Sequence, residues 1–213
     1  MLKIIKEACI GSLADAKNYL ETAKINQINR IETCSNLDQG GLTPELEVFN
    51  YIKSKNIEQV IMIRRHHSFM IQSEAELKQL IDDLNFYLDQ GATNFIFGYL
   101  TKTNEVDVLT CEKLIEQIKL RNNPKLNWNF HMAIDAANDY DQAFKTLINL
   151  GFTRVLTKGG QTPAINNLEN LKRLNQVYGN QIEIIVGGKV TDQNYQMIIE
   201  KTGIKQVHGV KIA

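Results

Sequence analysis

Short apolar runs recur about eight times along this chain, and each run ends in polar residues. The runs cover residues 2–9, 28–34, 58–64, 94–97, 126–131, 152–157, 182–186 and 206–210. Amphipathic helical segments separate them, at residues 13–22, from Thr43-Pro44 onward, and at 73–90, 110–121, 140–150, 167–177 and 192–201. This repetition of strand, polar tip, loop and helix predicts an α/β protein, a TIM-type (β/α)8 barrel formed by residues 1–213 as a single domain.

The eighth run is not followed by another helical segment, so we expect the final helix to be missing or incomplete. Such a barrel leaves one flank of its last and first strands without cover. Exposed apolar surface favours association, and we therefore expect a homo-oligomer. A doubly wound open sheet is the competing architecture. It is disfavoured because no GxGxxG motif follows the first strand.

Two helix starts carry specific signals. Ser73 and Glu76 have the spacing of a capping box, in which each side chain accepts from the other residue's backbone. Thr43 followed by Pro44 predicts a helix with a threonine cap and proline in its first position.

Composition narrows the classes of partner. The chain has 24 basic and 24 acidic residues, and a nucleic-acid-binding protein would usually show a basic excess. No apolar stretch reaches the roughly 18 residues that span a bilayer. The N-terminus becomes charged too soon for a signal peptide, which indicates the cytoplasm. The three cysteines then predict reduced thiols rather than disulfides.

Alternation along the strands gathers charged residues on one face. If each in-phase set points into the barrel, its top layer holds Glu7, Glu32, Arg64 and His131, and Asp135 follows shortly after. Buried charge requires pairing or a ligand. Two interpretations are open: a structural salt-bridge network that plugs the barrel, or a site for a small polar ligand.

Cys9 and Cys34 occupy equivalent places on neighbouring strands, which lie roughly 4.8 Å apart in a sheet. Two thiolates at that separation are suited to a soft metal such as Cu(I). The alternative is that both are simply small buried apolar residues.

Four glycines follow late strands and are candidates for phosphate binding through backbone N–H groups, or for ordinary turns. They are Gly160, Gly187, Gly188 and Gly209.

Taken together, these motifs resemble the CutC family of copper homeostasis proteins. The segments that carry the resemblance are EAC at 7–9, RIETCSNLDQGGLTP at 30–44, VIMIR at 60–64, FGYL at 97–100, FHMAID at 130–135, RVLTKGG at 154–160 and VGGKVTDQN at 186–194. The resemblance implies a TIM-type barrel, a cytoplasmic location and a role in handling copper. It makes Cys9 and Cys34 the candidate Cu(I) ligands.

The chain departs from the family pattern in its positive charges. It has MIRRHH in place of MIRPR, Met132 in place of a basic residue, and no serine after the histidine of VHGV. These changes remove positive charge that would suit an anionic ligand, and Lys158 and Lys189 are candidates to compensate.

Two hypotheses follow. The first is a copper homeostasis protein that binds Cu(I) through its cysteines. The second is an enzyme that performs acid–base chemistry on a small polar or phosphorylated metabolite. In the second, His131 or a carboxylate would move protons and Arg64 would hold an anionic group. Its candidate catalytic residues are Glu7, Glu32, Arg64, His131 and Asp135.

Overall fold

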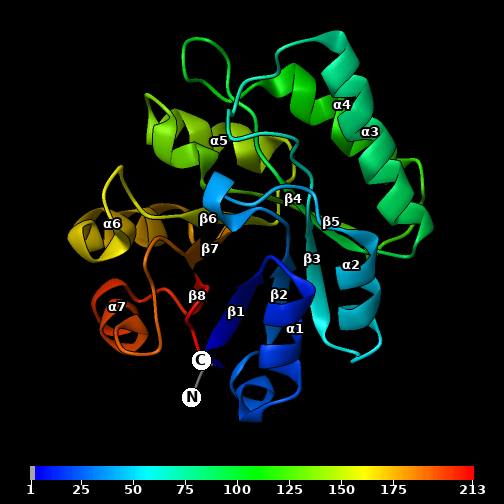
Figure 1. Cartoon of the computed structure of the whole chain (residues 1–213). Coiled ribbons are helices and arrows are strands. Elements are labelled where there is room, and N and C mark those ends of the chain that lie inside the picture. The colour runs from blue at the N-terminus through cyan, green and yellow to red at the C-terminus, as the bar shows by residue number, and fades with distance from the viewer. Residues whose placement is uncertain (1–2) are drawn as a thin grey trace.

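The computed structural model describes residues 3–213, which form one closed barrel of parallel strands ringed by helices (Figure 1). The strands are β1 (Ile5–Ile10), β2 (Arg30–Thr33), β3 (Glu58–Met62), β4 (Asn94–Phe97), β5 (Asn127–Phe130), β6 (Arg154–Thr157), β7 (Glu183–Val186) and β8 (Gln206–Gly209). The helices are α1 (Leu13–Leu20), α2 (Leu46–Lys53), α3 (Glu74–Asp89), α4 (Val108–Lys119), α5 (Tyr140–Asn149), α6 (Leu168–Tyr178) and α7 (Tyr195–Thr202). Each strand pairs with its sequence neighbour, and β8 pairs with β1. The predicted (β/α)8 barrel is confirmed.

The expected helix start at Thr43 and Pro44 is wrong. Helix α2 begins at Leu46, and Glu45 occupies the cap position without a side-chain cap bond. The Thr43 hydroxyl instead accepts from the Arg64 backbone N–H at 3.0 Å, and it lies 3.0 Å from the Arg64 carbonyl oxygen, to which it donates. A long-range contact with the end of β3 therefore uses the hydroxyl that a local cap would have needed.

The capping signal before α3 is half right. Ser73 Oγ accepts from the Glu76 backbone N–H at 3.1 Å, as the pattern predicts. The Glu76 carboxylate accepts from the Gln72 N–H at 2.7 Å, one residue before the expected donor.

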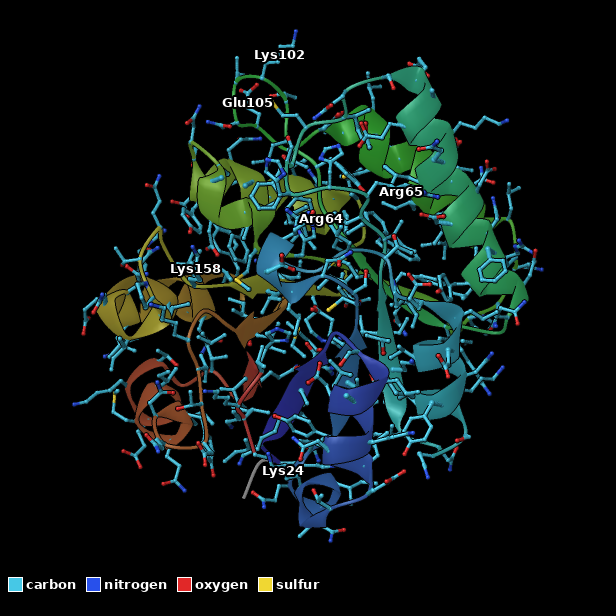
Figure 2. The ribbon with its side chains drawn as sticks, viewed as in Figure 1. Lys24, Arg64, Arg65, Lys102, Glu105 and Lys158 are labelled. Atoms are coloured by element: carbon cyan, nitrogen blue, oxygen red, sulfur yellow. The ribbon has the colours of Figure 1, made fainter. Side chains whose placement is uncertain are left out.

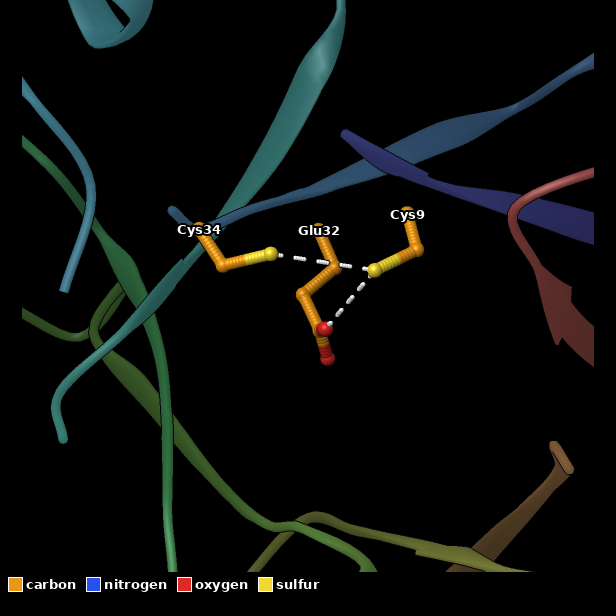
Figure 3. A group of neighbouring side chains, drawn as sticks. All are labelled: Cys9, Glu32 and Cys34. Carbon is orange, nitrogen blue, oxygen red and sulfur yellow. Dashed lines mark hydrogen bonds between the residues drawn. The ribbon is translucent and has the colours of Figure 1, made fainter. Parts of the chain in front are cut away.

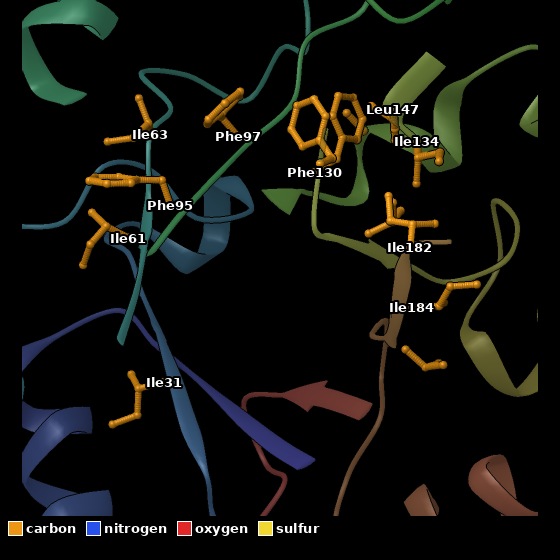
Figure 4. Close-up of a cluster of buried hydrophobic side chains, with 14 of the residues drawn as sticks. Ile31, Ile61, Ile63, Phe95, Phe97, Phe130, Ile134, Leu147, Ile182 and Ile184 are labelled. Atoms are coloured by element: carbon orange, nitrogen blue, oxygen red, sulfur yellow. The ribbon is translucent and has the colours of Figure 1, made fainter. Parts of the chain in front are cut away.

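Outward-facing strand residues and the inner faces of the helices form the main hydrophobic core (Figure 4). Ile61, Phe95 and Phe130 point from their strands into this layer and have no exposed surface. Full burial of a side chain of this size stabilises a fold by about 1.5–3 kcal/mol. The layer holds the strands in position, so the interior of the barrel need not be apolar.

The flank between β8 and β1 is covered, although no helix follows β8 within residues 3–213. The last residues cross this flank next to β1 (Figure 1). The Tyr19 hydroxyl donates to the Val210 carbonyl at 2.6 Å, Lys6 Nζ donates to the Ile212 carbonyl at 3.3 Å, and Ile212 is fully buried. An uncovered flank is therefore not a reason for self-association, and the homo-oligomer stays a prediction.

The helices were also compared with what a membrane span requires. None of the helices formed by residues 3–213 is long and apolar enough to cross a membrane.

Candidate functional site at the barrel mouth

The polar interior of the barrel is divided into two levels. The lower level, toward the amino ends of the strands, centres on an ion pair between Arg30 Nε and the Glu7 carboxylate. The other Glu7 oxygen lies 2.8 Å from His208 Nδ1. These three residues share a sheet register, because Glu7 lies opposite Arg30 on β2 and opposite His208 on β8.

Further hydrogen bonds extend this lower network around the barrel. Arg30 donates to Gln206 at 3.0 Å, and Gln206 donates to Glu183 at 2.9 Å. Arg154 also donates to Glu183, at 3.0 Å. Arg30 and Gln206 thus find partners within the protein, as a structural plug requires. The Glu183 side chain is 55% exposed, so its pair with Arg154 lies at the rim of the barrel, at the amino ends of the strands.

The charges of the lower level support one another. Burial opposes ionisation of Glu7, but Arg30 and His208 outweigh it and lower the pKa of Glu7 below its ordinary value. Burial also opposes the charge on His208, but Glu32, Cys9 and Glu7 outweigh it and raise the pKa of His208 well above its ordinary value. We therefore assign a carboxylate to Glu7 and an imidazolium to His208 at neutral pH.

The two cysteines meet above this level, beside Glu32 (Figure 3). Cys9 Sγ lies 3.7 Å from Cys34 Sγ and 3.5 Å from Glu32 Oε1, and all three side chains are buried. The hydrogen bond with Cys34, followed by burial, raises the pKa of the Cys9 thiol well above its ordinary value. Burial raises the pKa of Glu32 as well. The predicted closeness of the two thiols is thus present.

A cavity of about 670 Å³ opens above the cysteines at the carboxyl ends of the strands. Its polar and charged lining residues include Cys9, Glu32, Arg64, His131, Lys189, Thr191, His208 and Lys211. Its apolar lining residues are Leu37, Met62, Phe69, Met132, Leu156, Val190 and Val210. A volume of this size and a mixed lining are typical of small-molecule sites.

Arg64 crosses the wall of the cavity and is held at its far end. Its NH1 group donates to the Gly40 carbonyl at 3.1 Å, and its NH2 group donates to the His67 carbonyl. The guanidinium carbon lies 4.8 Å from the centre of the Phe69 ring, which fixes its plane. Among residues 3–213 the buried Nε–H has no hydrogen-bond partner.

His131 follows β5 and lies on the same cavity wall. Its Nδ1 accepts from the Ala133 backbone N–H at 3.1 Å, and burial followed by the charge on Arg64 lowers the pKa of His131 to about 3. The ring is therefore neutral at pH 7 and carries its hydrogen on Nε2. Within the described chain that Nε2 is buried and has no partner.

Gly98 makes room for the His131 ring. A Cβ atom at position 98 would lie 2.7 Å from His131 Nδ1 and 3.0 Å from the Phe130 ring. The imidazole thus occupies the space that a side chain at position 98, directly after β4, would fill.

Asp135 and Glu7 lie apart from the described lining of the cavity. Asp135 accepts from the Thr157 hydroxyl at 2.5 Å, from the Lys158 N–H at 2.9 Å and from the Tyr140 hydroxyl at 2.7 Å. It fastens the segment after β5 to the end of β6. Of the five candidate catalytic residues, the structure brings Glu32, Arg64 and His131 to the cavity, and it places Glu7 beneath it.

The candidate phosphate-binding glycines are also divided. Gly188 and Gly209 border the cavity, whereas Gly160 and Gly187 are outside its described lining. Packing explains the glycine at 209, because an added Cβ would lie 2.2 Å from the Val190 carbonyl oxygen. Of the two lysines, Lys189 lines the cavity, and Lys158 donates to the Gln161 carbonyl at 3.2 Å.

The sequence of this chain was compared with protein families and with known relatives. The model of the CutC family matches residues 4–213. The chain belongs to the CutC family. A CutC protein of Treponema denticola is 35% identical over 97% of this chain and 81% of its own length. The human copper homeostasis protein cutC homolog is 33% identical over 96% of this chain and 72% of its own length.

Solved structures agree with the CutC assignment. A CutC crystal structure from Streptococcus agalactiae has a TM-score of 0.88 and 34% sequence identity, and the match covers 99% of this chain and all of that one. A deoxyribose phosphate aldolase from Aeropyrum pernix has a TM-score of 0.67 at 11% identity, covering 96% and 85% of the two chains. At that identity the likeness shows the barrel fold alone.

Proposed function

We propose that this CutC-family protein takes part in copper homeostasis by binding Cu(I) between Cys9 and Cys34. The observation that carries the proposal is the 3.7 Å separation of the two sulfur atoms, inside the barrel and next to Glu32. Related proteins named for copper homeostasis support it.

The chemistry of the donor set favours a soft ion. Thiolates select Cu(I) and Zn²⁺ over hard cations such as Mg²⁺ or Ca²⁺. Cys9, Glu32 and Cys34 each offer one ligand atom, and these atoms lie within 4.8 Å of one another. Met62, which has a soft thioether, belongs to the same buried cluster as the two cysteines.

A second group of possible ligands, Glu7, Glu32 and His208, is equally compact. Two of its members are already committed, because Glu7 pairs with Arg30 and with His208. An ion bound there would have to displace those partners. The thiol pair is held by weaker contacts: Cys9 Sγ lies 3.5 Å from Glu32 Oε1, and Cys34 Sγ lies 3.5 Å from the Ile10 carbonyl oxygen.

Access and compartment fit this role. Cys9 lines the cavity, so an ion that enters the barrel mouth reaches the Cys9 sulfur first, and the Cys34 sulfur lies 3.7 Å beyond it. Free thiols persist in reducing compartments, and we therefore propose the cytoplasm as the place of action.

Anaerobic titration with Cu(I) in competition with a colorimetric chelator tests the proposal. We expect one Cu(I) per chain in the native protein and loss of binding in Cys9→Ser and in Cys34→Ser. Cys111→Ser is the matched control, because this third cysteine is buried in α4, outside the barrel. Unchanged copper affinity in both barrel variants would refute the thiol site.

A further inference from the structure

We infer that the cavity above the cysteines binds a small organic carboxylate, whose oxygen atoms accept hydrogen bonds from Arg64 Nε and His131 Nε2. This ligand site is separate from the proposed copper site, and neither requires the other. The inference starts from two residues that line one cavity and that each carry a buried N–H donor without a partner within residues 3–213.

The two donors differ in charge, but each requires a hydrogen-bond acceptor. A guanidinium N–H is always a donor, and the Nε2 of a neutral imidazole is a donor when Nδ1 accepts. The Ala133 N–H occupies Nδ1 of His131, so Nε2 carries the hydrogen. A buried donor without an acceptor destabilises the folded state, and a ligand oxygen removes that cost.

Both donors are held rigidly, as a binding site requires. The remaining nitrogens of Arg64 are bound to carbonyls of the loops after β2 and β3. The Phe69 ring packs against both side chains: its centre lies 4.8 Å from the Arg64 guanidinium carbon and 5.4 Å from the centre of the His131 ring. Preorganised donors lose little entropy when a ligand binds.

The charge of the cavity selects an anion. Arg64, Lys189 and Lys211 contribute positive charge to the lining, and Glu32 is the one acidic residue in the described lining. His208 Nε2 lies 3.9 Å from the Glu32 carboxylate. The loss of basic residues noted in the sequence is thus partly made good by Lys189 and Lys211, whereas Lys158 takes no part in the described lining.

The apolar walls select an organic anion over an inorganic one. Leucine, methionine, phenylalanine and valine side chains supply much of the lining, and inorganic phosphate would leave them in contact with water. A carboxylate with an aliphatic body satisfies both the donors and the walls.

The test uses four probes, of which three share one six-carbon chain: hexanoate, 1-hexanol, hexylamine and inorganic phosphate. Isothermal titration or ligand-observed NMR on the full chain gives their dissociation constants. We expect hexanoate to bind at least about tenfold more tightly than the other three. Equal binding of hexanol would show that the cavity recognises only the alkyl chain, and this would contradict a carboxylate site. Preferred binding of phosphate would contradict it as well. Absence of hexanoate binding up to about 10 mM would refute the site.

Two substitutions remove the donors. Arg64→Lys keeps a cation and loses Nε, together with the paired bonds to the Gly40 and His67 carbonyls. His131→Asn keeps an acceptor for the Ala133 N–H and loses Nε2. We expect each to weaken hexanoate binding about tenfold or more. Unchanged affinity in both would overturn the inference.

A neighbouring position provides the matched control. Arg65→Lys changes an exposed arginine that pairs with Asp83 of α3 and lies outside the described lining of the cavity; Figure 2 labels Arg65 near α3. This variant should not alter hexanoate affinity. The double variant Cys9→Ser, Cys34→Ser should still bind hexanoate, and Arg64→Lys should still bind Cu(I). A result that refutes one of the two sites therefore does not refute the other.

Discussion

The two levels of the barrel interior bury similar side chains and use them differently. In the lower level the charges of Glu7, Arg30 and His208 meet one another. In the upper level Arg64 and His131 are equally buried, yet each leaves one N–H without a partner in the described chain. The first arrangement is complete without a ligand, and the second is costly without one. What separates a structural plug from a binding site is thus the partner of each polar atom, and not the residue type.

The largest effect should come from breaking the lower level. Arg30→Met removes the cation beside a fully buried carboxylate, and we expect a loss of about 3–5 kcal/mol in the free energy of unfolding. Urea unfolding at neutral pH measures it. Arg154→Met is the control, because its partner Glu183 has a side chain that is 55% exposed and the pair should contribute about 1 kcal/mol or less. Similar losses in the two variants would contradict the distinction between plug and rim.

A smaller, pH-dependent effect should mark the upper level. The pKa of His131 is about 3 in the folded chain and near 6.5 in the unfolded chain. Between these values the unfolded state binds the extra proton, so acidification favours unfolding. The neutral ring therefore makes its full contribution to the free energy of unfolding above about pH 6.5, and this contribution is lost as the pH falls toward about 3.

His131→Asn isolates this contribution. Relative to the variant, the native protein should lose on the order of 1 kcal/mol of stability per pH unit between about pH 6 and about pH 4. Urea unfolding of both proteins across that interval provides the comparison. Parallel pH profiles would show that the buried ring is not held neutral.

The smallest effect concerns the support of the upper level. Thr43→Val removes the hydroxyl that contacts both the N–H and the carbonyl of Arg64. We expect a stability loss of about 1–2 kcal/mol and weaker hexanoate binding, with Thr43→Ser close to native. Unfolding and titration of the two variants measure this. A serine variant as impaired as the valine variant would assign the effect to the lost methyl group.

Much of this architecture was predictable from sequence. Period-two alternation correctly turned Cys9, Glu32, Arg64 and His131 inward, because side chains on a buried parallel strand have only two faces available. The family motifs led to the same residues. The hydrophobic pattern also located each strand to within a few residues, apart from the part of the first run at Leu2, which falls outside the described residues.

Depth within the barrel was not predictable in the same way. Glu7 was expected in the top layer, but β1 continues to Ile10, and the register sets Glu7 beside Arg30 and His208. Strands tilt and stagger in a closed barrel, so neighbouring strand tips do not share one level.

The position of Asp135 differs from the prediction for another reason. The 3₁₀ turn Met132–Ala136 ends the alternation and directs this carboxylate to β6. The local sequence predicts that the Thr43 hydroxyl caps a helix. Its actual partner, Arg64, lies 21 positions away, and a local pattern does not reveal such a contact.

Gly98 has a consequence for how this protein can change over time. A single methyl group at that position would lie 2.7 Å from His131 Nδ1. The imidazole would have to move, and with it the hydrogen bond to Ala133. Glycine to alanine directly after β4, at a position outside the described lining, would therefore displace one wall of the cavity. Replacement of this glycine is one way in which the cavity would change although every residue that lines it stays the same.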